Sequence, residues 1–268
     1  MEMNASKRYT LISGATGGIG SAFAAACAAR GENLLLTARS QERLSALRQK
    51  LLAMYPSVCV EICACDLADE SSRAALFAFA RGKGMRFSRL CNVAGVDIQK
   101  AFEKFTQEKI SLQCRVNLEA AVSLTHFVLD DRAERLEIVT IGSISAVYPM
   151  PYFALYSATK KAEESFFSAL RVEMRGKGVR VTVVEPGGVY TRPDICKDIE
   201  GQGLWGRLSA KQPAYIAEKS LAAVHKNKRV YRPGFWNKCV AVVPRILPLS
   251  WRMRFIARRW SRQEKDAF

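Results

Sequence analysis

The sequence feature that most constrains the fold is a glycine-rich turn near the N-terminus. It follows a short apolar run, residues 9–13, and precedes an Ala-rich run, residues 19–30, so it predicts a strand, a tight turn and a helix. We expect Gly14 to permit the turn, Gly18 to let a pyrophosphate group approach the backbone, and Gly20 to let helix and strand pack closely. The N-terminus of the helix then faces the phosphates. The alternative is a glycine-rich turn that binds no ligand.

The rest of the chain continues this alternation. Its 268 residues are enough for one α/β domain with a sizeable core. We predict a single doubly wound domain with a parallel sheet over residues 1–231, followed by a C-terminal extension, residues 232–268. The further predicted strands are residues 33–38, 58–64, 89–93, 137–141, 178–185 and 229–231. The further predicted helices are residues 41–55, 69–81, 107–129, 152–174 and 211–226.

Two polar residues share one face of a predicted helix. Residues 152–174 follow Pro151 and contain neither Gly nor Pro, which is typical of a helix. Tyr156 and Lys160 are four residues apart there, so their side chains lie on the same face. A neighbouring ammonium lowers the pKa of a tyrosine, which must fall by roughly 2–3 from ~10 for acid–base work near neutrality. A solvated helix face is the alternative explanation of this spacing.

Six motifs occur along the chain in a fixed order. They are SGATGGIG (13–20), NVAG (92–95), VN (116–117), GS (142–143), YSATK (156–160) and PGGVYT (186–191). This set resembles the short-chain dehydrogenase/reductases over residues 7–192. The resemblance implies a Rossmann-like fold and hydride transfer between NADP(H) and a ketone or secondary alcohol. Ser13 stands where the family usually has Thr, which keeps the hydroxyl, and Val93 replaces an Asn, which removes one polar contact.

The resemblance also implies a catalytic tetrad, Asn117, Ser143, Tyr156 and Lys160. Tyr156 donates a proton to the carbonyl oxygen, Lys160 lowers its pKa and bonds the nicotinamide ribose, and Ser143 polarises the carbonyl. Asn117 anchors a water that links Lys160 to solvent. Strand alternation does not choose between Ser143 and Ser145, and the family's offset to the tyrosine selects Ser143. A structural polar bridge is the alternative role for Asn117, which lies within a predicted helix.

Cofactor choice depends on the end of the second predicted strand. NAD-specific sites place an acidic residue there, whereas this chain has Ala38, followed by Arg39. Arginine suits a 2′-phosphate, so we expect NADP(H); the alternative is that Arg39 is a solvated loop charge. The implied cofactor-binding residues are Ser13, Gly14, Thr16, Gly18, Ile19, Gly20, Arg39, Asp66, Leu67, Asn92, Ala94, Gly95, Tyr156, Lys160, Pro186, Gly187, Val189 and Thr191.

Five candidate residues of the substrate pocket, Val147, Met150, Phe153, Tyr190 and Trp205, have large, apolar side chains. A bulky hydrophobic ketone or alcohol, steroid-like or lipid-like, therefore fits best. Residues 192–210 are Gly-rich and aperiodic, so we expect a mobile lid there. We expect a homodimer or homotetramer and no nucleic-acid partner; an NADP-binding sensor or membrane-recruited module with little turnover is the alternative function. The pocket residues are Ser143, Val147, Met150, Phe153, Tyr190 and Trp205.

The C-terminal extension carries most of the excess positive charge. The net charge is +16, and no acidic residue lies between Glu218 and Glu264. A basic amphipathic helix with tryptophans predicts docking on an anionic membrane surface. The alternative is that its apolar stripe packs on the core or on a subunit partner. The residues of that stripe are Leu249, Met253, Ile256 and Trp260.

Composition argues against a metal site and a membrane span. The eight cysteines have no paired spacing and the two histidines lie far apart, so we expect no metal. Small buried thiols are the expectation for Cys59, Cys63 and Cys65. No apolar run reaches ~18 residues and no signal peptide opens the chain. We therefore expect a cytoplasmic protein that meets a membrane only at its periphery.

Overall fold

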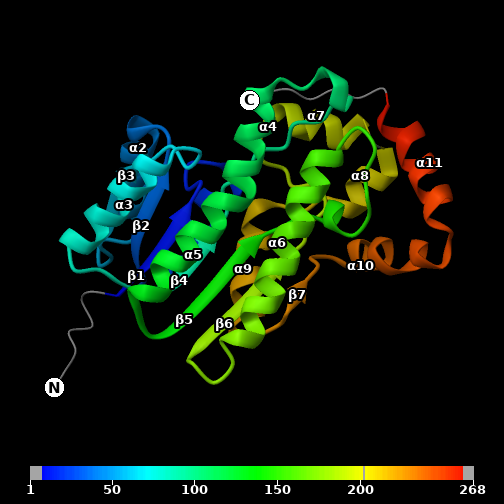
Figure 1. Ribbon diagram of the computed structural model, residues 1–268. Coiled ribbons are helices and arrows are strands. Elements are labelled where there is room, and N and C mark those ends of the chain that lie inside the picture. Colours follow the sequence, from blue (N-terminus) through cyan, green and yellow to red (C-terminus); the bar gives the residue numbers. More distant parts are fainter. Residues whose placement is uncertain (1–7, 202, 262–268) are drawn as a thin grey trace.

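A parallel sheet of seven strands organises the molecule (Figure 1). The structure is a computed structural model that describes residues 8–201 and 203–261. The strand order is β3-β2-β1-β4-β5-β6-β7, and all neighbouring strands pair in parallel. This topology confirms the predicted doubly wound sheet. The strands are β1 Arg8–Ser13, β2 Asn33–Ala38, β3 Val60–Ala64, β4 Arg86–Asn92, β5 Arg132–Ile141, β6 Val179–Val184 and β7 Val230–Tyr231.

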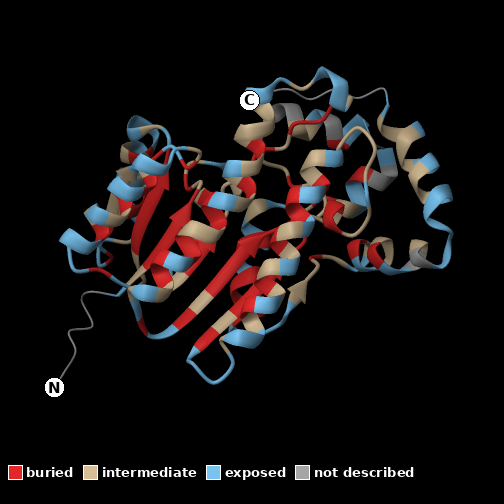
Figure 2. Ribbon diagram, in the orientation of Figure 1, coloured by how far each residue is buried: buried red, intermediate tan, exposed pale blue. Residues whose placement is uncertain are grey.

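Helices cover both faces of the sheet, which explains why its strands are almost wholly apolar. Alternate residues enter different cores: Leu35 packs with the helices of one face, whereas Leu34 and Leu36 pack with those of the other. Buried residues accordingly concentrate along the strands (Figure 2). The first face carries α3 Glu70–Gly82, α5 Ala120–Asp130 and α6 Ala154–Glu173. The second carries α1 Gly18–Ala28, α2 Gln41–Met54 and α9 Pro213–His225.

Two segments differ from the sequence predictions. The helix predicted over residues 107–129 runs as α4 Gln107–Cys114, a π-helical turn Arg115–Glu119 and α5, so its hydrogen-bond pattern changes midway. Residues 192–210 are not aperiodic as expected but form α7 Pro193–Gly201 and α8 Gly203–Ser209. Packing explains the second difference, because Ile199 is buried and a Cβ on Gly188 would lie 3.2 Å from its side chain.

The cysteine prediction is wrong at one position. Cys65 is buried and Cys63 partly buried, but Cys59 is exposed because it precedes the first residue of β3. Among the described residues, no group of His, Cys, Asp and Glu side chains is arranged to hold a metal ion.

The C-terminal extension forms α10 Phe235–Val242 and α11 Leu249–Trp260, which lie at the edge of the molecule beyond β7 (Figure 1). One face of α11 is covered: Met253, Ile256 and Trp260 are partly buried. Leu249, at the start of the same stripe, stays exposed. None of the helices in the described ranges is long and apolar enough to cross a membrane.

Candidate active site

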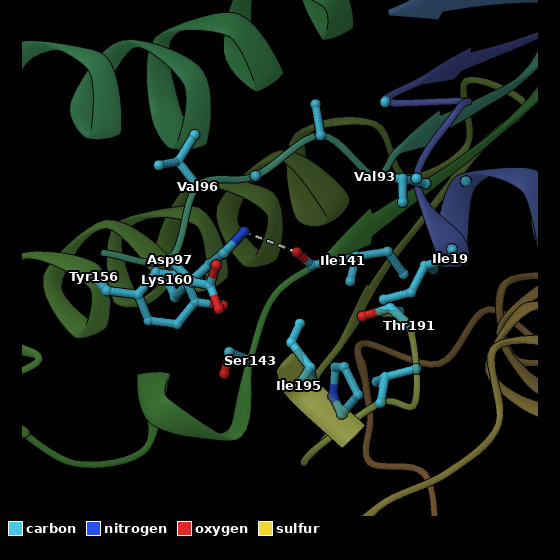
Figure 3. A pocket seen from close by; sticks show the side chains of 18 of the residues that line it. Ile19, Val93, Val96, Asp97, Ile141, Ser143, Tyr156, Lys160, Thr191 and Ile195 are labelled. Carbon is cyan, nitrogen blue, oxygen red and sulfur yellow. Dashed lines mark hydrogen bonds between the residues drawn. The ribbon is translucent and has the colours of Figure 1, made fainter. Parts of the chain in front are cut away.

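A cavity of about 910 Å³ opens at the carboxyl ends of the parallel strands. Its walls come from the turns that follow β1 to β6, which is where doubly wound sheets bind ligands. Arg39 and Asp66 follow β2 and β3 at one end of the cavity. Tyr156 and Lys160 line the other end, beside Ile141 of β5 (Figure 3). Sixteen of the implied cofactor residues line it: Gly14, Thr16, Gly18, Ile19, Gly20, Arg39, Asp66, Leu67, Ala94, Gly95, Tyr156, Lys160, Pro186, Gly187, Val189 and Thr191.

The glycine-rich turn is close to other backbone on two sides. Gly14 has a φ of 63°, and a Cβ there would lie 2.8 Å from the Cα of Ala94. A Cβ on Gly20 would lie 2.1 Å from the carbonyl oxygen of Gly14, so only glycine fits between β1 and α1. Ser13 does not line the cavity. Its buried Oγ instead accepts hydrogen bonds from the N–H groups of Val93 (3.0 Å) and Ala94 (3.2 Å), which fixes the turn to the loop after β4.

The N-terminus of α1 suits a pyrophosphate. No side chain caps this end of α1 and no acidic residue occupies its first turn. The N–H groups of Gly18 and the residues after it point out of a helix end that carries partial positive charge. Gly17, Gly18 and Gly20 line the cavity at this helix end, and the Thr191 side chain lies beside Gly18. The residues present therefore fit the phosphates of a nicotinamide dinucleotide.

Two arginines line the opposite end of the cavity from the tyrosine. Arg39 follows β2 and is exposed, as a side chain that meets a ligand phosphate must be. Arg43, which the sequence analysis did not single out, donates from its guanidinium to the carbonyl oxygen of Thr16 at 2.9 Å. Ser40 caps α2 by accepting from the N–H of Arg43 at 3.1 Å. Arg39 precedes the first residue of α2 and Arg43 lies in its first turn. This four-residue spacing in the sequence could have identified the second arginine.

The two serines after β5 act together. Ser143 Oγ accepts hydrogen bonds from the N–H of Ser145 at 3.2 Å and from the Ser145 hydroxyl at 2.8 Å. A hydroxyl has two lone pairs and one proton, so these bonds leave the Ser143 proton to be donated into the cavity. Both serines line the cavity, and Ser143 acts to lower the pKa of Tyr156. Ser143 is thus placed as a donor and Ser145 as its support.

Tyr156 and Lys160 lie together near the start of α6 (Figure 3). The Lys160 Nζ donates to the carbonyl oxygen of Ile141 at 2.9 Å and lies 5.9 Å from the centre of the Tyr156 ring. The expected lowering of the tyrosine pKa is not found in the protein alone. Burial raises the pKa of Tyr156, the charge of Asp97 raises it further, and the Ser143 hydroxyl opposes both. Asp97 also lines the cavity and was not predicted.

Asn117 lies behind the cavity wall rather than in it. It is fully buried in the π-helical turn, a feature common near functional sites. Its Oδ1 accepts from the N–H of Val96 (2.7 Å), and its Nδ2 donates to the Val96 carbonyl (2.9 Å) and to Thr159 Oγ1 (3.1 Å). These contacts fasten the loop after β4 to α6, which is the polar bridge named as the alternative. A Cβ on Gly95 would lie 3.6 Å from both Asn117 Oδ1 and Lys160 Nζ.

Asn92 also has an internal role. It is buried and does not line the cavity. Its Nδ2 donates to Thr125 Oγ1 at 3.2 Å and to Thr140 Oγ1 at 3.4 Å, and so ties β4 to α5 and β5. The adjacent loop, which carries Ala94 and Gly95, is held in place by this network.

The predicted substrate residues divide into two groups. Met150 and Phe153 line the cavity, whereas among the described side chains Val147 and Tyr190 do not. The side chain of Trp205 lies outside the described part of the chain. Trp260 lines the cavity instead, because α11 brings it to 6.5 Å from the Phe153 ring, which stacks on Tyr156 at 4.3 Å. In the sequence, the position of Trp260 in the apolar stripe of the C-terminal extension could have indicated that this side chain is covered.

The sequence is similar to those of known short-chain dehydrogenases and reductases. The sequence model of the short chain dehydrogenase family matches residues 8–197. Inactive hydroxysteroid dehydrogenase-like protein 1 of Homo sapiens is 31% identical over 239 residues, covering 87% of this chain and 70% of the relative. Sulfoacetaldehyde reductase of Chromohalobacter salexigens is 35% identical over 180 residues, covering 66% of this chain and 70% of the relative.

Solved structures share the fold. A 7β-hydroxysteroid dehydrogenase superposes with a TM-score of 0.83 at 22% identity, covering 96% of this chain and 100% of its own. L-sorbose reductase of Gluconobacter frateurii, in complex with NADPH and L-sorbose, has a TM-score of 0.75 at 24% identity, covering 87% of this chain and 97% of its own.

Proposed function

This chain belongs to the short-chain dehydrogenase/reductase family, and we propose that it is an NADP(H)-dependent reductase of bulky, hydrophobic ketones. One observation carries the proposal: Ser143, Tyr156 and Lys160 line one end of a cavity whose other end is lined by the glycine-rich turn, Arg39 and Arg43. A binding module has no use for a phenol near both a hydroxyl donor and an ammonium.

Each polar residue has a defined part in the reduction. Tyr156 gives its proton to the carbonyl oxygen, and Ser143 donates a hydrogen bond to the same oxygen as negative charge develops on it. The raised pKa of Tyr156 keeps the phenol protonated at neutral pH, which suits an acid. Lys160 holds the ribose of the cofactor, and Asn117 keeps the loop after β4 aligned with α6. The nicotinamide cofactor, when bound, supplies the hydride.

The choice of NADP(H) is supported by charge at the end of β2. Arg39 and Arg43 both line that end of the cavity, and β2 ends in Ala38 where an acidic residue would repel a 2′-phosphate. Guanidinium groups bind phosphate through charge-assisted hydrogen bonds.

A hydrophobic substrate is supported by the wall around Tyr156. Phe153, Met150, Val240 and Trp260 line this part of the cavity and are partly buried. Burying an apolar ligand against such side chains stabilises binding by roughly 25 cal/mol per Å² of apolar surface. A steroid-like or lipid-like ketone provides that surface.

The test is a screen of ketones and hydroxysteroids with NADPH and with NADH, following the absorbance of the reduced nicotinamide. We expect turnover of bulky apolar ketones with NADPH, and weaker turnover of small polar ketones of equal reactivity. A preference for NADH over NADPH contradicts the assignment of Arg39 to the 2′-phosphate of the cofactor. Tight NADPH binding without turnover of any ketone favours the sensor function instead; two of the similar proteins carry the word inactive in their names.

A membrane contact is the second proposal, and it rests on the exposed face of the C-terminal extension. No acidic residue lies between Glu218 and Glu264, so two copies of this basic segment would repel one another across a two-fold contact. Charge therefore favours an anionic lipid surface over a second copy, at ~1 kcal/mol per basic residue near the lipid. The most exposed apolar residues of this segment are Phe235 (78%), Val242 (59%), Ile246 (83%), Trp251 (64%) and Phe255 (73%).

Flotation with vesicles tests this contact. We expect the full chain to bind phosphatidylserine-containing vesicles and not phosphatidylcholine vesicles, and the double substitution Trp251→Ala and Phe255→Ala to abolish binding. Val172→Ala, at an exposed apolar residue of α6, is the matched control. Equal binding by the double variant, or a change in oligomeric state instead, contradicts membrane docking and assigns this face to a homodimer or homotetramer.

A further inference from the structure

A buried carboxyl group lies directly behind Lys160. Tyr156, Lys160 and Glu163 are spaced by four and three residues along α6, so they form one row on the same helix face. Glu163 is 1% exposed and Lys160 3%. The Glu163 Oε2 lies 2.8 Å from the Lys160 Nζ. A charge so deeply buried is costly unless it is paired, so this contact is the main stabilising interaction of the carboxylate.

The arrangement places Lys160 between the cavity and Glu163. Lys160 lines the cavity, whereas Glu163 is absent from its walls and belongs to the side of α6 that faces the core. The ammonium also donates to Ile141 O at 2.9 Å, which fixes its position at the end of β5. The lysine that would meet the cofactor therefore has a carboxyl partner on its far side.

Few charges act on this row. On α6 they are Tyr156, Lys160 and Glu163, and from the loop after β4 the charge of Asp97 reaches Tyr156. The π-helical turn contributes the neutral amide of Asn117, and β5 contributes the carbonyl of Ile141. Burial raises the pKa of Glu163 to about 7, although Lys160 opposes the shift, and the charge of Glu163 in turn raises the pKa of Tyr156.

We propose that Glu163 is a positioning residue that sets the charge of the Tyr156–Lys160 pair and thereby the pH range of each direction of the reaction. This inference rests on the proposed function. When Glu163 is ionised it neutralises Lys160, and Tyr156 stays protonated as the acid for carbonyl reduction. When Glu163 is protonated, Lys160 is an uncompensated cation that favours the phenolate, the base for alcohol oxidation.

The experiment compares pH profiles of reduction and oxidation for wild type, Glu163→Gln and Glu164→Gln. Glutamine keeps the shape of the side chain and removes its charge. We expect at least about a tenfold increase in the acidity of Tyr156 in Glu163→Gln, so that both profiles move to lower pH by about one unit or more. Glu164→Gln is the matched control, because Glu164 pairs with Lys161 and Arg229 outside the cavity. Coincident profiles for wild type and Glu163→Gln overturn the proposal.

A readout that needs no cofactor accompanies the kinetics. Tyrosinate absorbance is titrated in the free protein, and the signal of Tyr156 is the difference between each chain and the same chain carrying Tyr156→Phe. Its titration should move to lower pH in Glu163→Gln, and an unchanged titration overturns the proposal. Lack of turnover by wild type contradicts only the proposed function. If the Glu163→Gln variant does not fold, the carboxyl groups of the wild-type protein are titrated by infrared spectroscopy instead. The proposal is overturned if no carboxyl group titrates near pH 7.

Discussion

Substitution of Glu163 should change how the stability of the protein depends on pH. The pKa of this carboxyl is about 7 in the folded chain, against an ordinary value of 4.5, because burial disfavours its charged form. The folded state therefore binds this proton more tightly than the unfolded state. The resulting stabilisation is fully present below about pH 4.5 and is lost as pH rises through about 7. A difference of about 2.5 in pKa corresponds to about 3 kcal/mol.

Urea unfolding at several pH values between 4.5 and 8 measures this contribution. The free energy of unfolding of wild type minus that of Glu163→Gln should fall by about 3 kcal/mol over this range. Glu164→Gln supplies a control of opposite sign: partial burial raises the pKa of Glu164, but bonds from Lys161 and Arg229 bring it below its ordinary value. Its contribution is present at neutral pH and lost in acid. Parallel curves for wild type and Glu163→Gln would refute the reasoning.

Three further predictions concern the cavity. Arg39→Asp should reduce the preference for NADPH over NADH by roughly 10–150-fold in side-by-side kinetics, and an unchanged ratio contradicts the phosphate role. Gly20→Ala should prevent stable folding, because the added Cβ would lie 2.1 Å from the carbonyl oxygen of Gly14. Gly82→Ala has open space around the added Cβ and should leave the thermal midpoint unchanged or raise it. Equal thermal midpoints for the two variants contradict the packing argument. Trp260→Ala should raise the KM for bulky ketones with little change in kcat, whereas Trp251→Ala should not; equal effects place Trp260 outside the substrate site.

The sequence predicted the sheet, and the shared helix face of Tyr156 and Lys160, because both depend on local patterns. The strand at residues 33–38 matches β2 at both ends, because an apolar run bounded by polar residues has sharp limits. The glycines of the first turn line the cavity as expected, because only glycine fits where backbone meets backbone. The offset between Ser143 and Tyr156 likewise placed both residues in one site.

What the sequence did not predict depends on tertiary contact. Glu163 and Glu164 are adjacent and chemically identical, yet one is 1% exposed beside Lys160 while the other pairs with charges outside the cavity. The residue type alone cannot distinguish the two glutamates. They differ because only Glu163 lies on the face of α6 that packs against the core. Ser13 was assigned to the cofactor, and the structure uses its hydroxyl to hold the loop after β4.

The residues of the substrate wall were predicted mainly from their closeness in sequence to Ser143 and Tyr156. Closeness in sequence did not determine which side chains line the cavity. Val147 lies four residues from Ser143 but does not line the cavity, whereas Trp260 reaches it from the far end of the chain on α11. The pKa of Tyr156 shows the same limit. An ammonium four residues away predicts a fall, but in the protein alone burial and the charge of Asp97 raise the pKa.

Turnover by Tyr156→Phe tests the central claim most directly. The substitution removes one oxygen from the end of the cavity that holds Ser143 and Lys160 and leaves the glycine turn and both arginines intact. NADPH affinity, measured by fluorescence titration, should equal that of wild type, while turnover of the best ketone found in the screen should fall at least ~100-fold. Turnover near the wild-type rate, with NADPH still bound, would contradict the assignment of Tyr156 as the proton donor.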